Sequence, residues 1–243
     1  MIRILARAKV NLWLAIVGRR RDGYHELETV MQSVSLADEL IITPAEHSEV
    51  LLRWAPGLEG PVPQAPDIVE RTVAAARLKC SERPSISVTK RIPVGAGLGG
   101  ASADAAAALL GLARLEGPEC EGAMDVDALA QKLGADVPFC LRGGTALATG
   151  IGEVLQPLPC PVPLWWVVGI PRVALATVKV YQRYDEIVPP GGRPSRDGNA
   201  GPSSGDLALA LAAGDPEGVA ANLSNDLEVA AFDLMPGLAE LKA

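Results

Sequence analysis

One run of the chain reads Pro93-Val94-Gly95-Ala96-Gly97-Leu98-Gly99-Gly100-Ala101-Ser102-Ala103-Asp104, a glycine-dense turn that leads directly into an alanine-rich segment. Glycine has no Cβ, so the backbone N–H groups of such a turn can approach a ligand closely. Residues 101–115 are strong helix formers, and the start of a helix offers unpaired amides and a positive dipole end to an anion. The run therefore predicts a phosphate cradle in front of a helix, with a simple tight turn as the alternative.

The glycines can be compared with other phosphate-binding patterns. The spacing Gly95-x-Gly97-x-x-Gly100 formally matches the dinucleotide-binding fingerprint. The context differs, because residues 90–94 separate the glycines from the preceding strand and no second strand ends in an acid about twenty residues later. No Gly-Lys-Ser/Thr of a Walker A motif follows, and the protein-kinase catalytic motifs are absent. A dinucleotide-dependent oxidoreductase is therefore disfavoured.

The composition indicates a soluble globular protein. The chain has 243 residues, 49% of them hydrophobic, and a net charge of -7. This length predicts one or two domains with a real core, and the charge argues against nucleic acid as the main partner. No apolar run reaches the roughly 18 residues of a membrane span, and residues 1–10 do not resemble a secretory signal. We expect a cytoplasmic protein.

Cysteine and histidine are too sparse to suggest a metal cluster. The four cysteines, at positions 80, 120, 140 and 160, lie twenty or more residues apart, and there are two histidines, His25 and His47. Zinc and redox motifs need close pairs of thiolates. We expect ordinary buried or partly buried thiols.

The pattern of apolar residues and punctuation predicts a mixture of strands and helices. Strands are expected near residues 2–17, with a turn at 18–23, and at 38–43, 49–54, 85–89, 139–141, 145–148 and 164–171. Helices are expected at 67–79, at 101–115, from Asp125 or Asp127 to Leu133, and from Pro236 onward. Residues 189–205 are expected to be a mobile loop. Prolines between 155 and 163 suggest a boundary between domains 1–157 and 158–243.

The glycine run resembles the phosphate loop of the GHMP kinases, and other segments resemble one family among them, the 4-diphosphocytidyl-2-C-methyl-D-erythritol kinases. These segments are Ala8-Lys9-Val10-Asn11-Leu12, Gly18-Arg19-Arg20-Arg21-Asp22-Gly23-Tyr24-His25, Gly134-Ala135-Asp136-Val137-Pro138-Phe139 and Ser224-Asn225-Asp226-Leu227-Glu228. The resemblance implies an α+β, two-domain GHMP-kinase fold. Its N-terminal domain would be like ribosomal protein S5 and bind ATP, and its C-terminal α/β sandwich domain would be incomplete.

The resemblance also implies an activity, namely ATP-dependent phosphorylation of the 2-hydroxyl of 4-diphosphocytidyl-2-C-methyl-D-erythritol in the non-mevalonate isoprenoid pathway. Asp136 matches the catalytic base, on a loop where Pro138 would hold Val137 extended. Lys9 matches the catalytic lysine, which would neutralise developing charge and keep Asp136 ionised. Asn11, two residues further along the same strand, would face the same side as Lys9 and contact the substrate.

The remaining site residues follow from the same resemblance. ATP would be bound by Lys90 and by the loop, in full Pro93, Val94, Gly95, Ala96, Gly97, Leu98, Gly99, Gly100, Ala101, Ser102 and Ala103. The substrate would be bound by Asn11, Tyr24, His25, Asp136, Thr177 and Tyr181, with the aromatic side chains and His25 on the cytosine. Mg²⁺ is expected with ATP, and Ser102 is a candidate phosphate or magnesium contact; the sequence identifies no other metal ligand.

Some features depart from the family pattern. Ala101 and Ala103 stand where small or Ser residues are usual, and Asp67 and Asp104 where Asn is usual; the Asp104 carboxylate would repel phosphate and weaken ATP binding. The chain is expected to stop before a third, glycine-rich family motif, so a nucleotide-binding but inactive form is an alternative, as is another GHMP kinase. The expected partner is a small molecule, without nucleic acid or membrane, for a monomer or weak homodimer.

Overall fold

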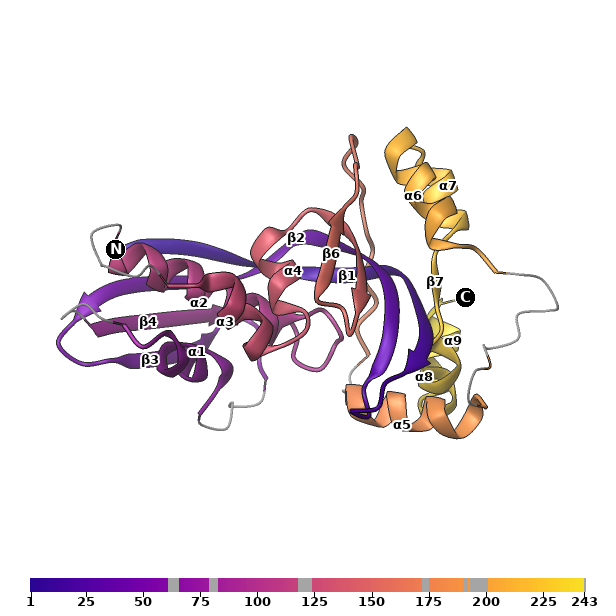
Figure 1. Ribbon diagram of the computed structural model, residues 1–243. Helices are drawn as coiled ribbons and strands as arrows, with labels where there is room; N and C mark the ends of the chain where they lie inside the picture. The colour runs from indigo at the N-terminus through magenta and orange to yellow at the C-terminus, as the bar shows by residue number, and fades with distance from the viewer. Residues whose placement is uncertain are drawn as a thin grey trace. The chain divides into compact units, whose positions relative to one another are not determined.

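The computed structural model describes residues 1–60, 66–78, 83–117, 124–171, 175–189, 192 and 201–242 (Figure 1). Its strands are β1 Ile2–Arg19, β2 His25–Ala45, β3 Glu49–Trp54, β4 Arg83–Lys90, β5 Thr145–Gly150, β6 Val154–Pro157 and β7 Ser224–Asn225. Its helices are α1 Ile68–Ala76, α2 Gly100–Glu116, α3 Val126–Leu133, α4 Val137–Arg142, α5 Thr177–Ile187, α6 Ser204–Ala213, α7 Pro216–Ala221, α8 Glu228–Leu234 and α9 Gly237–Lys242. Cys80, Cys120 and most of the predicted loop 189–205 lie outside the described residues.

The chain divides into two compact units. The first contains Met1–Val10, Ser33–Val94 and Leu98–Gly143, and the second contains Asn11–Gln32, Gly95–Gly97 and Gly144–Ala243. The long strands β1 and β2 contribute residues to both units. Residues 11–32 and 144–157 belong to the second unit, so this division differs from the predicted domain boundary between residues 157 and 158. That boundary stays a prediction.

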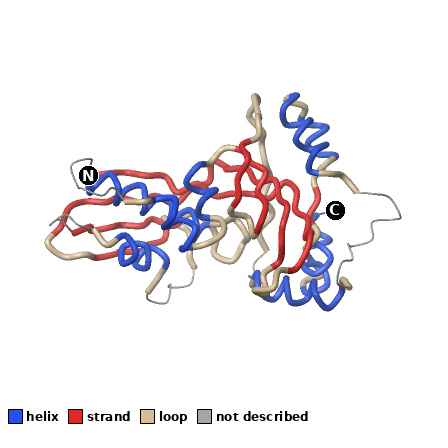
Figure 2. Tube along the Cα trace, in the orientation of Figure 1, coloured by secondary structure: helices blue, strands red, loops and turns tan. Residues whose placement is uncertain are grey.

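The first unit packs helices against a small sheet. In it β2 pairs antiparallel with β4, with Leu40 opposite Val88 and Ile42 opposite Ile86, and β3 runs parallel to β4. The four apolar side chains at these positions are fully buried. Helix α2 packs against α1, α3 and α4, and Figure 2 shows these helices alongside the strands of the unit.

Helix α2 can approach the strands closely because its surface is built from small residues. A Cβ added at Gly111 would lie 2.1 Å from Ile42 Cδ1 and 3.3 Å from Ile4 Cδ1, so a side chain at this position would push the helix off β2 and β1. On another part of the helix, Ala105, Ala106 and Leu109 form a core with Ala130 and Val137. The alanine-rich sequence thus sets how closely α2 lies to its neighbours.

The second unit has its own core. In it β1 pairs in parallel with the short β7, with Leu14 opposite Asn225, while β2 pairs antiparallel with β5 and β5 with β6. The buried members of the core come from β1, α5 and the adjoining chain, and α8: Leu14, Ile16, Val180, Tyr184, Val188 and Ala230. Asp226 fixes β7 beside β1, because its backbone N–H donates to Leu14 O at 2.9 Å and its Oδ2 accepts from Ile16 N at 3.0 Å.

Most predicted elements are confirmed, and helices α1 and α3 begin at the capping residues that the sequence offers. Asp67 caps α1 in a capping box, in which Glu70 N donates to Asp67 Oδ1 and Asp67 N donates to Glu70 Oε2, both at 2.8 Å. Asp125, rather than Asp127, caps α3, and Gly134 ends it. The helix predicted after Pro236 is α9. Among the described residues, no helix has both the length and the apolar character to cross a membrane.

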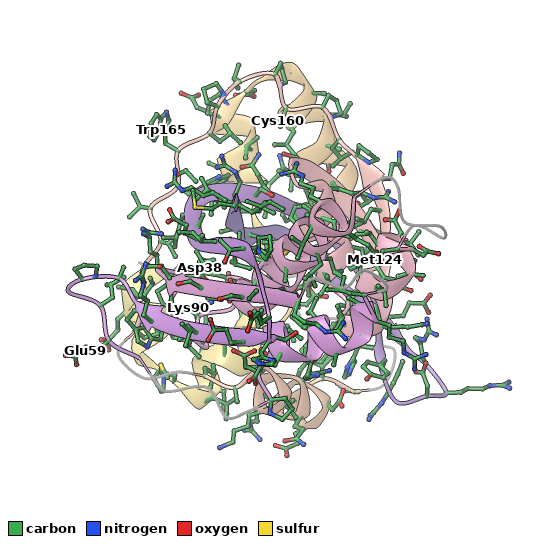
Figure 3. The ribbon with its side chains drawn as sticks, turned by 90° about the vertical axis from the view of Figure 1, so that its left-hand side faces the viewer. Asp38, Glu59, Lys90, Met124, Cys160 and Trp165 are labelled. Carbon is green, nitrogen blue, oxygen red and sulfur yellow. The ribbon has the colours of Figure 1, made fainter. Side chains whose placement is uncertain are left out.

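Two predicted strands are wrong. Residues 139–141 lie in helix α4, where Pro138 is accommodated in the first turn because that turn needs no N–H from it. The apolar run of Val137 and Phe139 is as compatible with a short buried helix as with a strand. Residues 164–171 form no strand, and the Trp165 side chain, labelled in Figure 3, is 93% exposed.

Candidate active site

The glycine loop adopts the conformation that its sequence predicts. Gly95, Gly97 and Gly99 have φ values of 73°, 73° and 71°, in the left-handed region that favours glycine. Gly99 is the N-cap of the 17-residue helix α2 and has no side chain to cap the first amides. These amides and the helix dipole are therefore available to an anion at the start of α2, as a phosphate cradle requires.

Lys9 and Asp136 come together in the first unit. Lys9 lies on β1 with 8% of its surface exposed, and its Nζ is 3.5 Å from Asp136 Oδ2. The Asp136 side chain is 34% exposed, so its carboxylate remains reachable from solvent. The two residues predicted to be catalytic thus form an ion pair that is buried on the lysine side and open on the aspartate side.

The local structure around Asp136 differs from the expectation. Asp136 is the N-cap of α4 with φ -83° and ψ -12°, and its C=O accepts from Cys140 N at 3.0 Å. Val137 is therefore helical, and Pro138 does not hold it extended. The carboxylate stands at the start of a short helix instead of on an extended loop.

Cys140 lies one turn into α4. Burial, with a smaller contribution from the negative charge of Asp136, raises the pKa of its thiol to about 12. The thiol therefore stays protonated at neutral pH and is unsuited to act as a nucleophile.

The glycine loop rests directly on Lys9. Lys9 N donates to Leu98 O at 2.9 Å, which joins the loop to β1. A Cβ added at Gly99 would lie 2.9 Å from Lys9 Cγ and 3.2 Å from Lys9 Cε. Only glycine at this position lets the loop cover the lysine stem without displacing it.

We expect Gly99→Ala to destabilise the protein more than Gly97→Ala. Both glycines have positive φ, so each substitution carries a backbone strain of about 1–2 kcal/mol. No described atom lies within 4 Å of a Cβ at Gly97, whereas the Cβ at Gly99 meets Lys9. Urea unfolding of the two variants measures the difference; equal losses of stability would show that the contact with Lys9 is relieved at no cost.

A buried ion network in the first unit joins strands β2 and β4 to helix α2. Lys90 Nζ donates to Asp38 Oδ2 and, at 2.5 Å, to Asp104 Oδ2. Asp38, Lys90 and Asp104 are 0%, 5% and 3% exposed. Lys90, predicted to contact the nucleotide, therefore has its ammonium group enclosed by two carboxylates.

The placement of Asp104 alters the expectation for ATP binding. Its carboxylate points into the unit at Lys90 and is not on the surface of the loop, so it does not present an exposed negative charge to a phosphate. Burial raises the pKa of Asp104 to about 7, against the opposing attraction of Lys90, and the Asp38 charge raises it further. Its Oδ1 has no hydrogen-bond partner among the described residues. Ionisation of Asp104 is therefore less favourable than that of an ordinary, solvent-exposed aspartate.

We expect the stability of the protein to fall as the pH rises from about 4 through about 7. The pKa of Asp104 is about 7 in the folded protein and 3.8 for an ordinary aspartate, so its contribution to stability is fully present below the lower value and is lost as the pH rises through the upper one. The difference corresponds to at most about 4 kcal/mol. The free energy of unfolding measured in urea at pH 5 and pH 8 tests this, with Asp104→Asn as the comparison.

Asparagine cannot ionise, so the variant should lack this part of the pH dependence while other groups contribute equally to both proteins. If wild type and Asp104→Asn show the same difference between pH 5 and pH 8, Asp104 does not titrate in this range.

In the second unit, His25 is held in an aromatic and ionic setting that we call the His25 cluster: Arg19, His25, Tyr181, Tyr184 and Asp185. The imidazole stacks on Tyr181 with centroids 4.9 Å apart and meets Tyr184 edge-on at 6.4 Å. His25 Nε2 is 2.7 Å from Asp185 Oδ1, and Arg19 Nη1 is 3.2 Å from Asp185 Oδ2. The cluster joins two predicted substrate residues, His25 and Tyr181, on β2 and α5.

The other predicted substrate residues have simpler surroundings. Asn11 Nδ2 donates to Thr29 Oγ1 at 2.8 Å, and that hydroxyl donates to Trp13 O at 2.7 Å. Tyr24 is 61% exposed, and Thr177 is the exposed first residue of α5, one turn before Tyr181.

Two carboxylates were not singled out by the sequence. Asp38 stands in a strand and carries no motif, so nothing in the sequence distinguished it from a surface acid. Asp185 lies four residues after Tyr181, which places both on one face of α5, and this spacing could have suggested it. Among the described residues, no group of three or more His, Cys, Asp or Glu side chains is arranged to hold a metal ion.

Comparisons with known proteins place the chain among related kinases. Residues 67–144 match the GHMP kinases N terminal domain. The chain is 42% identical over 246 residues to the 4-diphosphocytidyl-2-C-methyl-D-erythritol kinase of Symbiobacterium thermophilum, covering 98% of this chain and 81% of that protein. It is also similar to a crystal structure of a 4-(cytidine 5'-diphospho)-2C-methyl-D-erythritol kinase, with TM-score 0.71, 35% identity and coverage of 99% and 81%. A homoserine kinase from Cytophaga hutchinsonii shares the fold, with TM-score 0.64, 20% identity and coverage of 99% and 77%.

Proposed function

We propose a mechanism from one premise: the chain belongs to the 4-diphosphocytidyl-2-C-methyl-D-erythritol kinase family. It is therefore a kinase with the α+β GHMP-kinase fold, it uses ATP, and its acceptor is 4-diphosphocytidyl-2-C-methyl-D-erythritol in the non-mevalonate isoprenoid pathway. The homoserine kinase similarity, at 20% identity, concerns the fold alone.

In our proposal Asp136 is the catalytic base and Lys9 its electrostatic partner. The single observation that carries this assignment is the 3.5 Å pair of Lys9 Nζ and Asp136 Oδ2, with the carboxylate partly open to solvent. The Asp136 carboxylate accepts the proton of the acceptor hydroxyl while that oxygen bonds to the γ-phosphorus and the bond to the ADP oxygen breaks. The Lys9 ammonium stabilises the charge that develops on the transferred group.

The glycine loop and the first turn of α2 bind the phosphates of ATP in this proposal. Support comes from the positive φ of Gly95, Gly97 and Gly99 and from the uncapped amides at the start of α2. Because the glycines carry no Cβ, their N–H groups can approach the phosphates closely. Mg²⁺ bound with ATP would neutralise phosphate charge, and the Ser102 hydroxyl in the first turn of α2 is a suitable oxygen ligand for phosphate or metal.

The His25 cluster binds the cytosine in this proposal. A carboxylate accepts hydrogen bonds, so Asp185 favours the tautomer of His25 that carries its proton on Nε2, and in a neutral ring Nδ1 is then an acceptor for an exocyclic amine. The stacked Tyr181 ring and the exposed Tyr24 ring offer aromatic faces to a base. Asn11 and Thr177 supply polar groups for the rest of the substrate.

The experiment that tests the proposal is ADP release by the chain with MgATP and 4-diphosphocytidyl-2-C-methyl-D-erythritol. Mevalonate and homoserine serve as alternative acceptors, and His25→Gln as a variant that retains polarity but loses the ring. We expect release to depend on the cytidyl acceptor, and His25→Gln to raise the KM for that acceptor more than the KM for ATP. ATP binding without transfer to any of the acceptors would instead indicate a nucleotide-binding form without activity.

A further inference from the structure

Asp38, which is fully buried on β2, accepts hydrogen bonds from the chain that enters the glycine loop. Its Oδ1 accepts from the backbone N–H of Arg91 and, at 2.8 Å, from that of Ile92. Its Oδ2 accepts from Lys90 Nζ, and Figure 3 shows Asp38 and Lys90 side by side. One carboxylate therefore holds three consecutive residues immediately before the loop begins at Pro93.

The chain that leaves the loop is hydrogen-bonded to the same lysine, Lys90. Asp104, in the second turn of α2, accepts from Lys90 Nζ through Oδ2. Ile92 and Gly100 also lie against each other, since a Cβ at Gly100 would be 3.0 Å from Ile92 Cγ2. Lys90 thus links strand β2 to helix α2 across the two ends of the loop.

Such a network is a costly way to obtain stability alone. Removing charges from water is unfavourable, and apolar side chains of similar volume often replace a buried ion pair without loss of stability. Charged hydrogen bonds instead fix distances and directions tightly. Here the charged hydrogen bonds orient the two ends of the glycine loop. The amides of that loop must face phosphate oxygens if it is to bind ATP.

We propose that Asp38, Lys90 and Asp104 are positioning residues for ATP, which set the conformation of the glycine loop by fastening its entering and leaving chains to each other. The proposal rests on the assignment of this loop to ATP. The residues act through the loop and do not themselves touch the nucleotide, so their loss should weaken ATP binding while leaving the acceptor site unchanged.

The hydrogen-bond pattern predicts opposite results for the same substitution at the two aspartates. Asp38 uses both oxygens as acceptors, so Asp38→Asn turns an NH₂ group toward a donor and breaks the network. Asp104 uses one oxygen, so in Asp104→Asn the amide oxygen can still accept from Lys90. Asp104→Ala removes this acceptor but leaves Lys90 paired with Asp38, so one cation faces one anion and we expect the fold to be retained.

The test compares the Kd of ATP, the KM for ATP, the KM for the acceptor and kcat in these three variants. We expect Asp38→Asn and Asp104→Ala to raise the Kd and the KM for ATP about tenfold, with the KM for the acceptor within twofold of wild type. Asp104→Asn should restore ATP binding to within threefold of wild type. Val88→Ala is the matched control, because Val88 is fully buried two residues before Lys90 on β4 and carries no charge.

Val88→Ala should lower the Tm without changing the Kd of ATP at a temperature where it is folded. The proposal is overturned if Asp104→Ala and Asp104→Asn bind ATP equally well, or if Val88→Ala weakens ATP binding as much as Asp104→Ala does. Either result leaves the proposed function intact, because that depends on acceptor-dependent ADP release by the wild-type chain. If Asp38→Asn fails to fold, the comparison of Asp104→Ala with Asp104→Asn tests the proposal on its own.

Discussion

Asp136→Asn is expected to lower kcat about 1,000-fold while ATP still binds with nearly its wild-type Kd. General base catalysis by a positioned carboxylate contributes about 10²- to 10⁴-fold, and asparagine keeps the shape of the side chain but cannot accept the proton. The substitution also removes the partner of Lys9, whose Nζ lies 3.5 Å from Asp136 Oδ2. Single-turnover measurements of phosphoryl transfer, together with a titration of ATP binding, separate the chemical step from nucleotide affinity.

Asp127→Asn is the matched control for this prediction. Asp127 lies in the first turn of α3, its side chain is 70% exposed, and it forms a long ion pair of 3.6 Å with Arg142. The same loss of a carboxylate at this surface position should leave kcat within twofold of wild type. If Asp136→Asn retained more than about a tenth of the wild-type kcat, Asp136 would not be the base, since proton abstraction would then proceed without it.

The sequence was informative where a local rule acts alone. The capping residue Asp67 and the terminating Gly134 depend on groups three or four residues away, and the positive φ of the loop glycines depends on their own missing Cβ. The pairing of Lys9 with Asp136 was accessible only through the resemblance, because no spacing rule connects two residues so far apart in the chain.

The sequence was uninformative where tertiary contacts decide. Asp104 on α2 was expected to face a phosphate, but the direction of its side chain depends on Lys90 from β4 and Asp38 from β2. The strand predicted at 139–141 is a helix because Phe139 and Val137 find a core beside α2, which their apolar character alone does not specify. The roles of the site residues remain predictions for the variants to test.

Lys90→Met is expected to destabilise the protein by about 3–5 kcal/mol at pH 8. Methionine fills a similar volume, but removing one partner of a buried ionic network leaves uncompensated charge, which costs about this much. Two carboxylates, Asp38 and Asp104, would then lie together with less than a tenth of either residue exposed. Urea unfolding at pH 8 measures the loss of free energy of unfolding, and the midpoint denaturant concentration should fall without a change in slope.

The pH dependence of this variant distinguishes buried charge from poor packing. Without Lys90 the buried negative charge can be reduced by proton uptake at Asp104, whose pKa burial already raises to about 7, so Lys90→Met should regain much of its stability at pH 5. Lys132→Met removes the same charge from an exposed site in the last turn of α3 and should change stability by less than about 0.5 kcal/mol at either pH. A loss in Lys90→Met that was equally large at pH 5 and pH 8 would mean that the fit of the side chain, and not its charge, holds β4 to β2 and α2. Because Lys90 pairs with two acidic side chains, we expect most of the lost free energy of unfolding to depend on pH.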